Sequence, residues 1–151
     1  MTDNADDAGS ADADLYAPDA GLEYLRTRGS GALAERMGIE FVSCTPELAV
    51  ARMPVEGNTQ PFGLVHGGAY VVLGESLGSM HANWLSGPDR FAVGIDINAT
   101  HTGSASSGWV TGECRPISVG GTIAVHEIVV LNDAGTRCST IRITNLIRAR
   151  R

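Results

Sequence analysis

One stretch of the chain, from Asn58 to Trp84, carries residues that could polarise and attack a carbonyl group. It begins with a polar loop that ends in His66-Gly67-Gly68, and an apolar run of about five helical turns follows. Two glycines at the start of a helix leave its first backbone N–H groups open to an anion. Glu75 lies alone among apolar residues in the middle of this run, and Ser79 follows four residues later. The stretch therefore combines an electrophilic helix N-terminus with a candidate base or nucleophile.

These groups suit the hydrolysis of an activated acyl group, and their spacing adds a constraint. Such a reaction needs a donor for the developing oxyanion and a base or nucleophile at the carbonyl carbon. Gly67 and Glu75 are eight residues apart, which is about 12 Å along a helix axis. Both residues of one subunit are then too far apart to act on one carbonyl. We therefore expect a two-fold dimer in which Glu75 of one chain lies beside Gly67 of the other, with Ser79 on the same helix face as Glu75.

Composition narrows the class of protein. A chain of 151 residues is most simply one domain with a real hydrophobic core. Its net charge of −6 and its 5% aromatic content argue against a nucleic-acid partner and against an anionic membrane surface. We find no apolar run of membrane-spanning length and no hydrophobic N-terminal segment typical of a signal peptide. The sequence therefore predicts a cytoplasmic protein.

Cysteine and histidine spacing predicts neither a disulfide framework nor a metal site. The three widely spaced cysteines, expected to be reduced and buried, are Cys44, Cys114 and Cys138. CxxC and H-x-x-x-H patterns are absent, and no metal-ligand spacing is shared by the histidines His81, His101 and His126. We therefore expect no metal and no cofactor.

The pattern of apolar and turn-forming residues predicts an α+β domain. Residues 1–18 are predicted to be a disordered tail, and residues 19–151 a single domain. Short helical pieces, with Asp19 as N-cap, are expected up to about residue 36, before a hairpin over 38–55 and a long helix over about 65–85. Four further strands are predicted at residues 91–102, 107–118, 122–131 and 136–148. Together they form a mostly antiparallel sheet of about five to six strands, which Gly74 and Gly78 let the helix approach closely.

This order, with a G-x-V-H-G-G loop opening the central helix, resembles the hotdog fold. Within that fold the chain resembles acyl-CoA thioesterases of the phenylacetate-pathway type, and most of all the 4-hydroxybenzoyl-CoA thioesterases of the Arthrobacter type. The resemblance covers residues 37–148, and its core is Gln60, residues 63–70, Glu75 and Ser79. It implies hydrolysis of an acyl-CoA, possibly aromatic, to the free acid and CoA, with no cofactor beyond the CoA thioester itself. It also implies a homodimer with shared sites, assembled into a dimer-of-dimers tetramer.

The resemblance also implies roles for individual residues. The Gly67 N–H would polarise the thioester carbonyl, and Glu75 would be either the nucleophile or the general base. Gln60 and His66 would bind or orient the thioester, and Ser79 would position water or the acyl group. The substrate- and CoA-binding residues that the resemblance suggests are Gly68, Asn98, Thr100, Gly121, Thr122, Arg148 and Arg150.

A structural explanation without a role in catalysis is also open for several of these residues. Glu75 could face solvent on an amphipathic helix, and His66 could serve only to stabilise the loop. Ordinary strand polarity could account for Asn98, Thr100 and His101, which otherwise would line the acyl pocket. Where the family often carries an Arg-Pro pair, this chain has Gly103-Ser104. A contact to CoA phosphate would then move to one of the arginines Arg115, Arg148 and Arg150.

Two other functions remain open from the sequence. A hotdog hydratase or dehydratase acts on acyl thioesters too, but usually with a His paired to an acid on the opposing chain. The other is a non-catalytic acyl-CoA-binding protein, although such regulators usually carry a DNA-binding element. Release of free CoA thiol separates hydrolysis from both.

Overall fold

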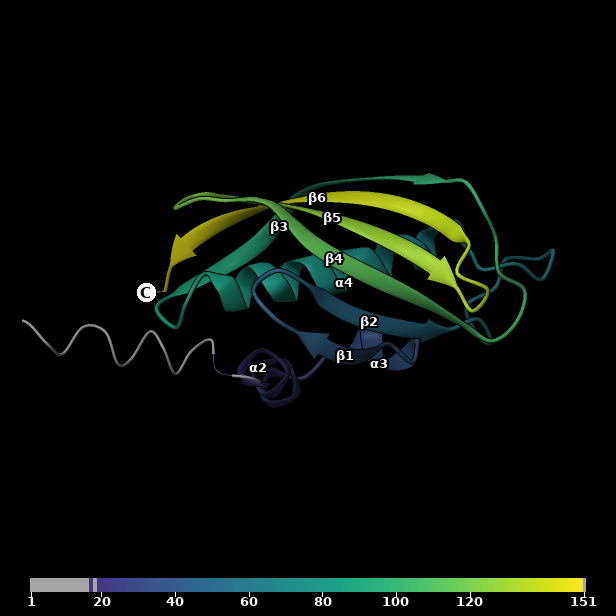
Figure 1. The fold of residues 1–151 in the computed structure, drawn as a ribbon, viewed down its shortest axis with the longest axis horizontal. Helices are drawn as coiled ribbons and strands as arrows, with labels where there is room; N and C mark the ends of the chain where they lie inside the picture. The colour runs from purple at the N-terminus through teal and green to yellow at the C-terminus, as the bar shows by residue number, and fades with distance from the viewer. Residues whose placement is uncertain (1–16, 18, 151) are drawn as a thin grey trace, which may run out of the picture.

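The computed structural model describes Ala17 and residues 19–150, and these form a curved sheet and three helices (Figure 1). The helices are α2 (Ala20–Arg28), α3 (Ala32–Arg36) and α4 (Gly67–Leu85). The strands are β1 (Glu40–Cys44), β2 (Ala49–Pro54), β3 (Arg90–His101), β4 (Trp109–Val119), β5 (Ile123–Asn132) and β6 (Arg137–Ala149). Apart from Ala17, the predicted tail lies outside the described residues.

The six strands form one antiparallel sheet in the order β1-β2-β4-β5-β6-β3. Hairpins connect β4 to β5 and β5 to β6, as their turn signals predict. β3 pairs with β6 along its whole length, from Arg90 opposite Ala149 to His101 opposite Ser139. β3 and β1 are therefore the two edges of the sheet, and the long β3 edge lies beside α4.

The sheet arches over α4, which lies along its inner face (Figure 1). Leu73 and Leu77 of α4 are fully buried in a core that β6 completes with Ile141 and Ile143. A Cβ added at Gly74 would lie 2.7 Å from Cδ1 of Ile141, and one at Gly78 would lie 2.5 Å from Cγ2 of Ile143. The prediction that these glycines allow close approach of helix and sheet is confirmed, and the α+β hotdog architecture is confirmed with it.

One local prediction needs correction, and the predicted N-cap is confirmed in position although its side chain makes no capping bond. The central helix begins at Gly67 rather than Val65, because Val65 pairs with Thr59 in a short bridge and donates its N–H to the Ala105 carbonyl. Asp19 is the N-cap of α2, but its φ is 71° and its side chain makes no capping hydrogen bond. Its carbonyl, which accepts from Glu23 N–H at 2.9 Å, closes the first turn instead.

The three cysteines are buried and free, as predicted. None of the helices within the described residues has the combination of length and apolarity that crossing a membrane requires.

Candidate active site

The loop before α4 is fixed by one buried side chain. Asn58 is 8% exposed, and its Nδ2 donates to the carbonyls of Met37 at 2.8 Å and Pro54 at 2.9 Å. Its own carbonyl accepts from the His66 N–H at 2.9 Å. The loop is therefore closed at its base, and the entry to α4 is held against the segment before β1 and the end of β2.

His66 caps α4 through its side chain. Its Nδ1 accepts from the Gly68 N–H at 2.8 Å, so one of the orphan donors of the helix start is satisfied. Among the described residues, no acceptor is bonded to the Gly67 N–H. The cap therefore leaves the Gly67 donor, at the positive end of a 19-residue helix, for a ligand.

His101, at the end of β3, lies against Gly67. A Cβ added at Gly67 would be 2.9 Å from His101 Nε2. His101 Nδ1 is 2.9 Å from the Ser139 hydroxyl, which itself donates to the Thr100 carbonyl at 3.4 Å. When the hydroxyl donates to that carbonyl, its oxygen accepts from Nδ1–H of the imidazole, and in this tautomer Nε2 presents its lone pair beside Gly67.

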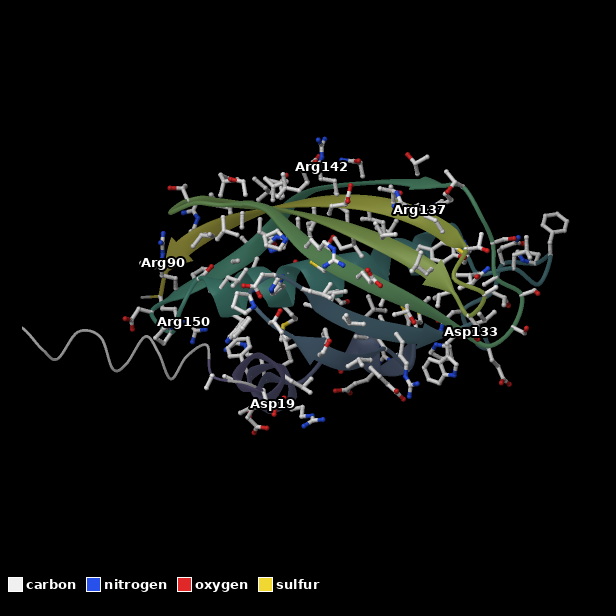
Figure 2. All side chains as sticks on the ribbon, in the orientation of Figure 1. Asp19, Arg90, Asp133, Arg137, Arg142 and Arg150 are labelled. Atoms are coloured by element: carbon white, nitrogen blue, oxygen red, sulfur yellow. The ribbon has the colours of Figure 1, made fainter. Side chains whose placement is uncertain are left out.

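Sequence reasoning considered His101 only as one lining residue of an acyl pocket. The missed signal is strand alternation, because Ile97 and Ala99 pack on the core face of β3 and His101 continues that face. Asn98 and Thr100 take the opposite face, where Asn98 pairs with the exposed Arg142 (Figure 2). Within one chain, these two predicted site residues are thus not brought to Gly67.

Glu75 projects from α4 toward the middle of β3. It is half-buried, and a Cβ added at Gly94 would meet its Oε1 at 2.6 Å. Gly94 therefore makes room for the carboxylate against the strand backbone. Among the described residues no cation forms a salt bridge with Glu75. The carboxylate is held at a different position along β3 from His101 and Gly67.

Gln60 and Ser79 are engaged in hydrogen bonds within the chain. Gln60 Oε1 accepts from the Phe62 N–H at 2.6 Å and so shapes the loop, whose Phe62 is 88% exposed. The Ser79 hydroxyl donates to Oδ1 of the buried Asn145 at 3.0 Å. Both side chains keep acceptor lone pairs, so the contacts that the resemblance implies for them stay predictions.

Most of the predicted CoA-binding residues lie at the end of the sheet where Figure 2 labels Arg90 and Arg150. Arg90 donates to the Gly121 carbonyl, and Arg150 Nε donates to the Arg90 carbonyl at 3.0 Å. The Thr122 carbonyl accepts from the N–H of Ile147, the residue before Arg148, at 2.7 Å. Arg115, the other arginine considered for phosphate, forms a surface ion pair with Glu113 at 3.2 Å on β4. We call the end of the sheet that carries Arg90, Arg148 and Arg150 the basic end. It lies beyond Glu75, at the opposite end of β3 from His101.

One chain thus carries two separate half-sites. The first is the Gly67 donor with His66 and His101, and the second is the Glu75 carboxylate with the basic end. Eight helical residues separate Gly67 from Glu75, or about 12 Å of rise, as the sequence predicts.

Comparison with known proteins identifies the family. The family model described as the thioesterase superfamily matches residues 62–139. The proofreading thioesterase EntH of Klebsiella pneumoniae is 43% identical over 124 residues, covering 81% of this chain and 90% of the relative. The 1,4-dihydroxy-2-naphthoyl-CoA hydrolase of Escherichia coli is 39% identical over 127 residues, covering 83% and 93%.

Solved structures show the same relationship. The thioesterase HI1161 from Haemophilus influenzae has a TM-score of 0.80 and 33% identity, covering 85% of this chain and 90% of that one. The range that the family model matches contains the end of the loop before α4 and Glu75. The matches do not single out the Arthrobacter type, which stays a prediction. By its sequence and its fold, the chain belongs to the thioesterase superfamily and is a thioester hydrolase.

Proposed function

We propose that the protein hydrolyses an acyl-CoA thioester to the free carboxylic acid and CoA, and that the acyl group is aromatic. The observation that carries the reaction is the Gly67 N–H, for which the described part of the chain supplies no acceptor, at the start of a helix whose Glu75 is the reactive carboxylate. The aromatic preference is supported by the Escherichia coli relative, whose name gives a naphthoyl-CoA as its substrate.

Gly67 would act on the carbonyl oxygen. Its N–H donates to that oxygen, and the helix dipole stabilises the negative charge that develops as the carbon becomes tetrahedral. His101 Nε2, beside Gly67, supplies an acceptor that can orient water at the same carbonyl. The roles of His66 and Gly68 are then to fix the helix start, through the bond between them.

Glu75 would supply the nucleophile. As a general base it takes a proton from water while the water oxygen bonds to the carbonyl carbon; as a nucleophile it attacks the carbon itself and water hydrolyses the anhydride. In either route the C–S bond breaks, and CoA leaves as a thiol once it gains a proton. Water is consumed, and one acid and one CoA are formed.

The two half-sites become one site in a dimer that pairs β3 with β3. β3 is an edge strand of twelve residues, with Val93 42% exposed and Ile95 55% exposed. An unpaired strand edge with apolar side chains is a template for a second chain. If a two-fold axis passes between Ile97 and Asn98, antiparallel pairing sets His101 of one chain opposite Gly94 of the other. Gly67 then lies near the partner's Glu75.

The same pairing also suggests where the CoA part of the substrate would bind. In the partner chain, the basic end lies beyond the Glu75 counterpart and extends past the end of the first chain's β3. It carries the counterparts of Gly121, Thr122, Arg148 and Arg150. A CoA whose thioester reaches Gly67 could thus place its phosphates near arginines of the second chain. The tetramer that the resemblance implies would join two such dimers and leave this shared site unchanged.

Release of free thiol from a panel of aromatic and aliphatic acyl-CoAs tests the proposal. We expect turnover with at least one aromatic ester, and Glu75→Gln should lower kcat by about 10²- to 10⁴-fold because the base or nucleophile is lost. Glu127→Gln, at an exposed position on β5, is the matched control and should retain wild-type turnover.

Three results would contradict the proposal. A wild-type protein that binds acyl-CoA without releasing thiol would be a binding protein. Conversion of the acyl chain with CoA still attached would identify a hydratase or dehydratase. Unchanged kcat in Glu75→Gln would remove the proposed role of this carboxylate.

A further inference from the structure

The C-terminal half of α4 contributes to a cluster of metal-ligating side chains that the thioesterase site does not use. His81 on α4, Cys114 on β4 and His126 on β5 are all fully buried. The ligand atoms of the three residues lie within 4.8 Å of one another. Thirty-three residues separate His81 from Cys114 in the sequence, so local spacing gave no sign of the cluster.

His81 has a fixed tautomer that leaves a lone pair directed into the cluster. Its Nε2 lies 2.9 Å from the Thr45 carbonyl, and because a carbonyl only accepts, Nε2 carries the proton. Nδ1 then faces the Cys114 sulfur at 3.8 Å. A ligating histidine that donates its other N–H to a backbone carbonyl is the usual outer-shell arrangement of protein metal sites.

Ordinary packing does not explain the unpaired ring nitrogens of His126. It is 0% exposed, yet neither ring nitrogen has a hydrogen-bond partner among the described residues. Its ring meets the His81 ring edge-on, with centroids 5.1 Å apart. Buried polar atoms are nearly always satisfied, so two orphan nitrogens on one side chain indicate a missing partner.

The protonation states of the cluster suit a cation better than a proton. Burial, and then the neighbouring His81, lowers the pKa of His126 to about 4. Burial also lowers the pKa of His81. Both imidazoles are therefore neutral at neutral pH and can offer lone pairs. Burial raises the pKa of the Cys114 thiol, so without an ion the sulfur stays protonated.

We propose that His81 Nδ1, Cys114 Sγ and a ring nitrogen of His126 form a buried zinc site. Two imidazoles and one thiolate are the ligand types that Zn²⁺ prefers. Zinc holds such atoms at about 2.0–2.3 Å, so the three side chains close in by only about 1 Å. Binding converts the thiol to a thiolate and releases one proton per ion to solvent.

The site lies away from the thioesterase chemistry and has a structural role. It joins the end of α4 to β4 and β5, and through Thr45 to the turn between β1 and β2. Along the helix, His81 is fourteen residues from Gly67, or about 21 Å, and six from Glu75, or about 9 Å; His81 faces β4 and β5, whereas Glu75 lies against β3. The proposal therefore does not rest on the proposed function, and the activity assay does not test it.

Because the ligands are fully buried, the ion is best supplied while the chain folds. We would express the full chain in minimal medium supplemented with Zn²⁺, or with Co²⁺ as a coloured probe, and count ions per chain after purification. We expect about one ion per chain, and a thiolate-to-cobalt charge-transfer band in the cobalt protein. Cys114→Ser and His126→Gln should lower the ion content by at least about tenfold.

Cys138→Ser is the matched control. Cys138 is an equally buried thiol, but it contacts Tyr70, which is eleven residues, or about 16 Å, from His81 along α4. This variant should keep both the ion and the band. If Cys114→Ser fails to fold, the band in the wild-type and Cys138→Ser proteins still tests thiolate ligation.

Two outcomes would overturn the proposal. One is a wild-type protein with far less than one ion per chain under both supplements. The other is an ion content that persists in Cys114→Ser, or that appears without a charge-transfer band, because exposed histidines such as His66 would then be the ligands.

Discussion

At the scale of single residues, the role proposed for the Gly67 donor depends on the described residues leaving its N–H without an acceptor. His66 takes the neighbouring N–H of Gly68, and the space where a Gly67 side chain would lie is filled by His101. Glycine is thus required here by contact rather than by backbone strain, since Gly67 has no positive φ.

We expect Gly67→Ala to lower kcat/KM by about tenfold to a hundredfold. The added methyl would lie 2.9 Å from His101 Nε2, and His101 is held by Ser139, so the ring or the helix start must shift. A shift of about 1 Å near a reacting carbonyl costs on that order in rate. Steady-state kinetics with the best acyl-CoA provide the measurement.

Gly112→Ala is the control for this substitution. Its methyl would make ordinary contacts, the nearest at 3.4 Å to Leu77, in a buried position away from both half-sites. It should keep wild-type kinetics. Full activity in Gly67→Ala would show that the position next to His101 has no part in catalysis.

Some site residues could be predicted from the sequence, and others could not. Gly67, His66 and Glu75 stood out because a glycine-opened helix and a lone acid in an apolar run are local signals. The pairing of His101 with Gly67 joins residues 34 positions apart and depends on how β3 lies against α4. The cluster of His81, Cys114 and His126 depends on the same kind of long-range packing.

At the scale of elements, α4 is positioned by two small residues. Gly74 and Gly78 allow the helix to lie directly on β6, and this close contact sets the height of Glu75 above β3. The strands and the helix were predictable because their apolar periodicity and turn residues are local. The pairing of β2 with β4 and of β3 with β6 was not, because each joins strands that are not hairpin neighbours.

We expect Gly74→Ala and Gly78→Ala to lower the free energy of unfolding by about 1–3 kcal/mol, as overpacking of a core does. The two variants should respond differently to a second substitution. At Gly74 the nearest atom is Cδ1 of Ile141, which Ile141→Val removes, so that change should restore part of the loss. At Gly78 the nearest atom is Cγ2 of Ile143, which valine retains, so Ile143→Val should give no relief.

Denaturant unfolding of the singles and doubles measures these differences. Alanine favours a helix over glycine by about 1 kcal/mol, which opposes the cost of overpacking. If both alanine variants are more stable than the wild-type protein, the helix does not depend on close approach at these positions.

At the scale of the whole molecule, the proposed active site depends on the edge strand β3, through which two chains would pair. The Gly67 and Glu75 half-sites lie apart on one chain, and β3 with Val93 and Ile95 is the edge available to bring a second chain alongside. Catalysis and assembly should therefore be lost together.

We expect the double substitution Val93→Glu/Ile95→Glu to give monomers without thioesterase activity. Charged side chains on an edge strand block its pairing with another chain. Size-exclusion chromatography with light scattering, combined with the thiol-release assay, measures both properties. Ile117→Glu/Val119→Glu, at exposed apolar positions on β4, should leave the β3-paired dimer and its activity intact. A fully active monomer would refute the shared site.

The most direct measurement mixes two inactive variants. Glu75→Gln keeps Gly67, whereas a bulky Gly67→Leu keeps Glu75, and each homodimer should be nearly inactive. After the subunits are exchanged, a mixed dimer holds one site built from the intact Gly67 of one chain and the intact Glu75 of the other. Random exchange gives half mixed dimers with one of two sites restored, so thioesterase activity should rise to about a quarter of wild type. If mixed dimers form, as mass spectrometry can show, and activity stays at the level of the two variants, the two half-sites do not meet across the interface.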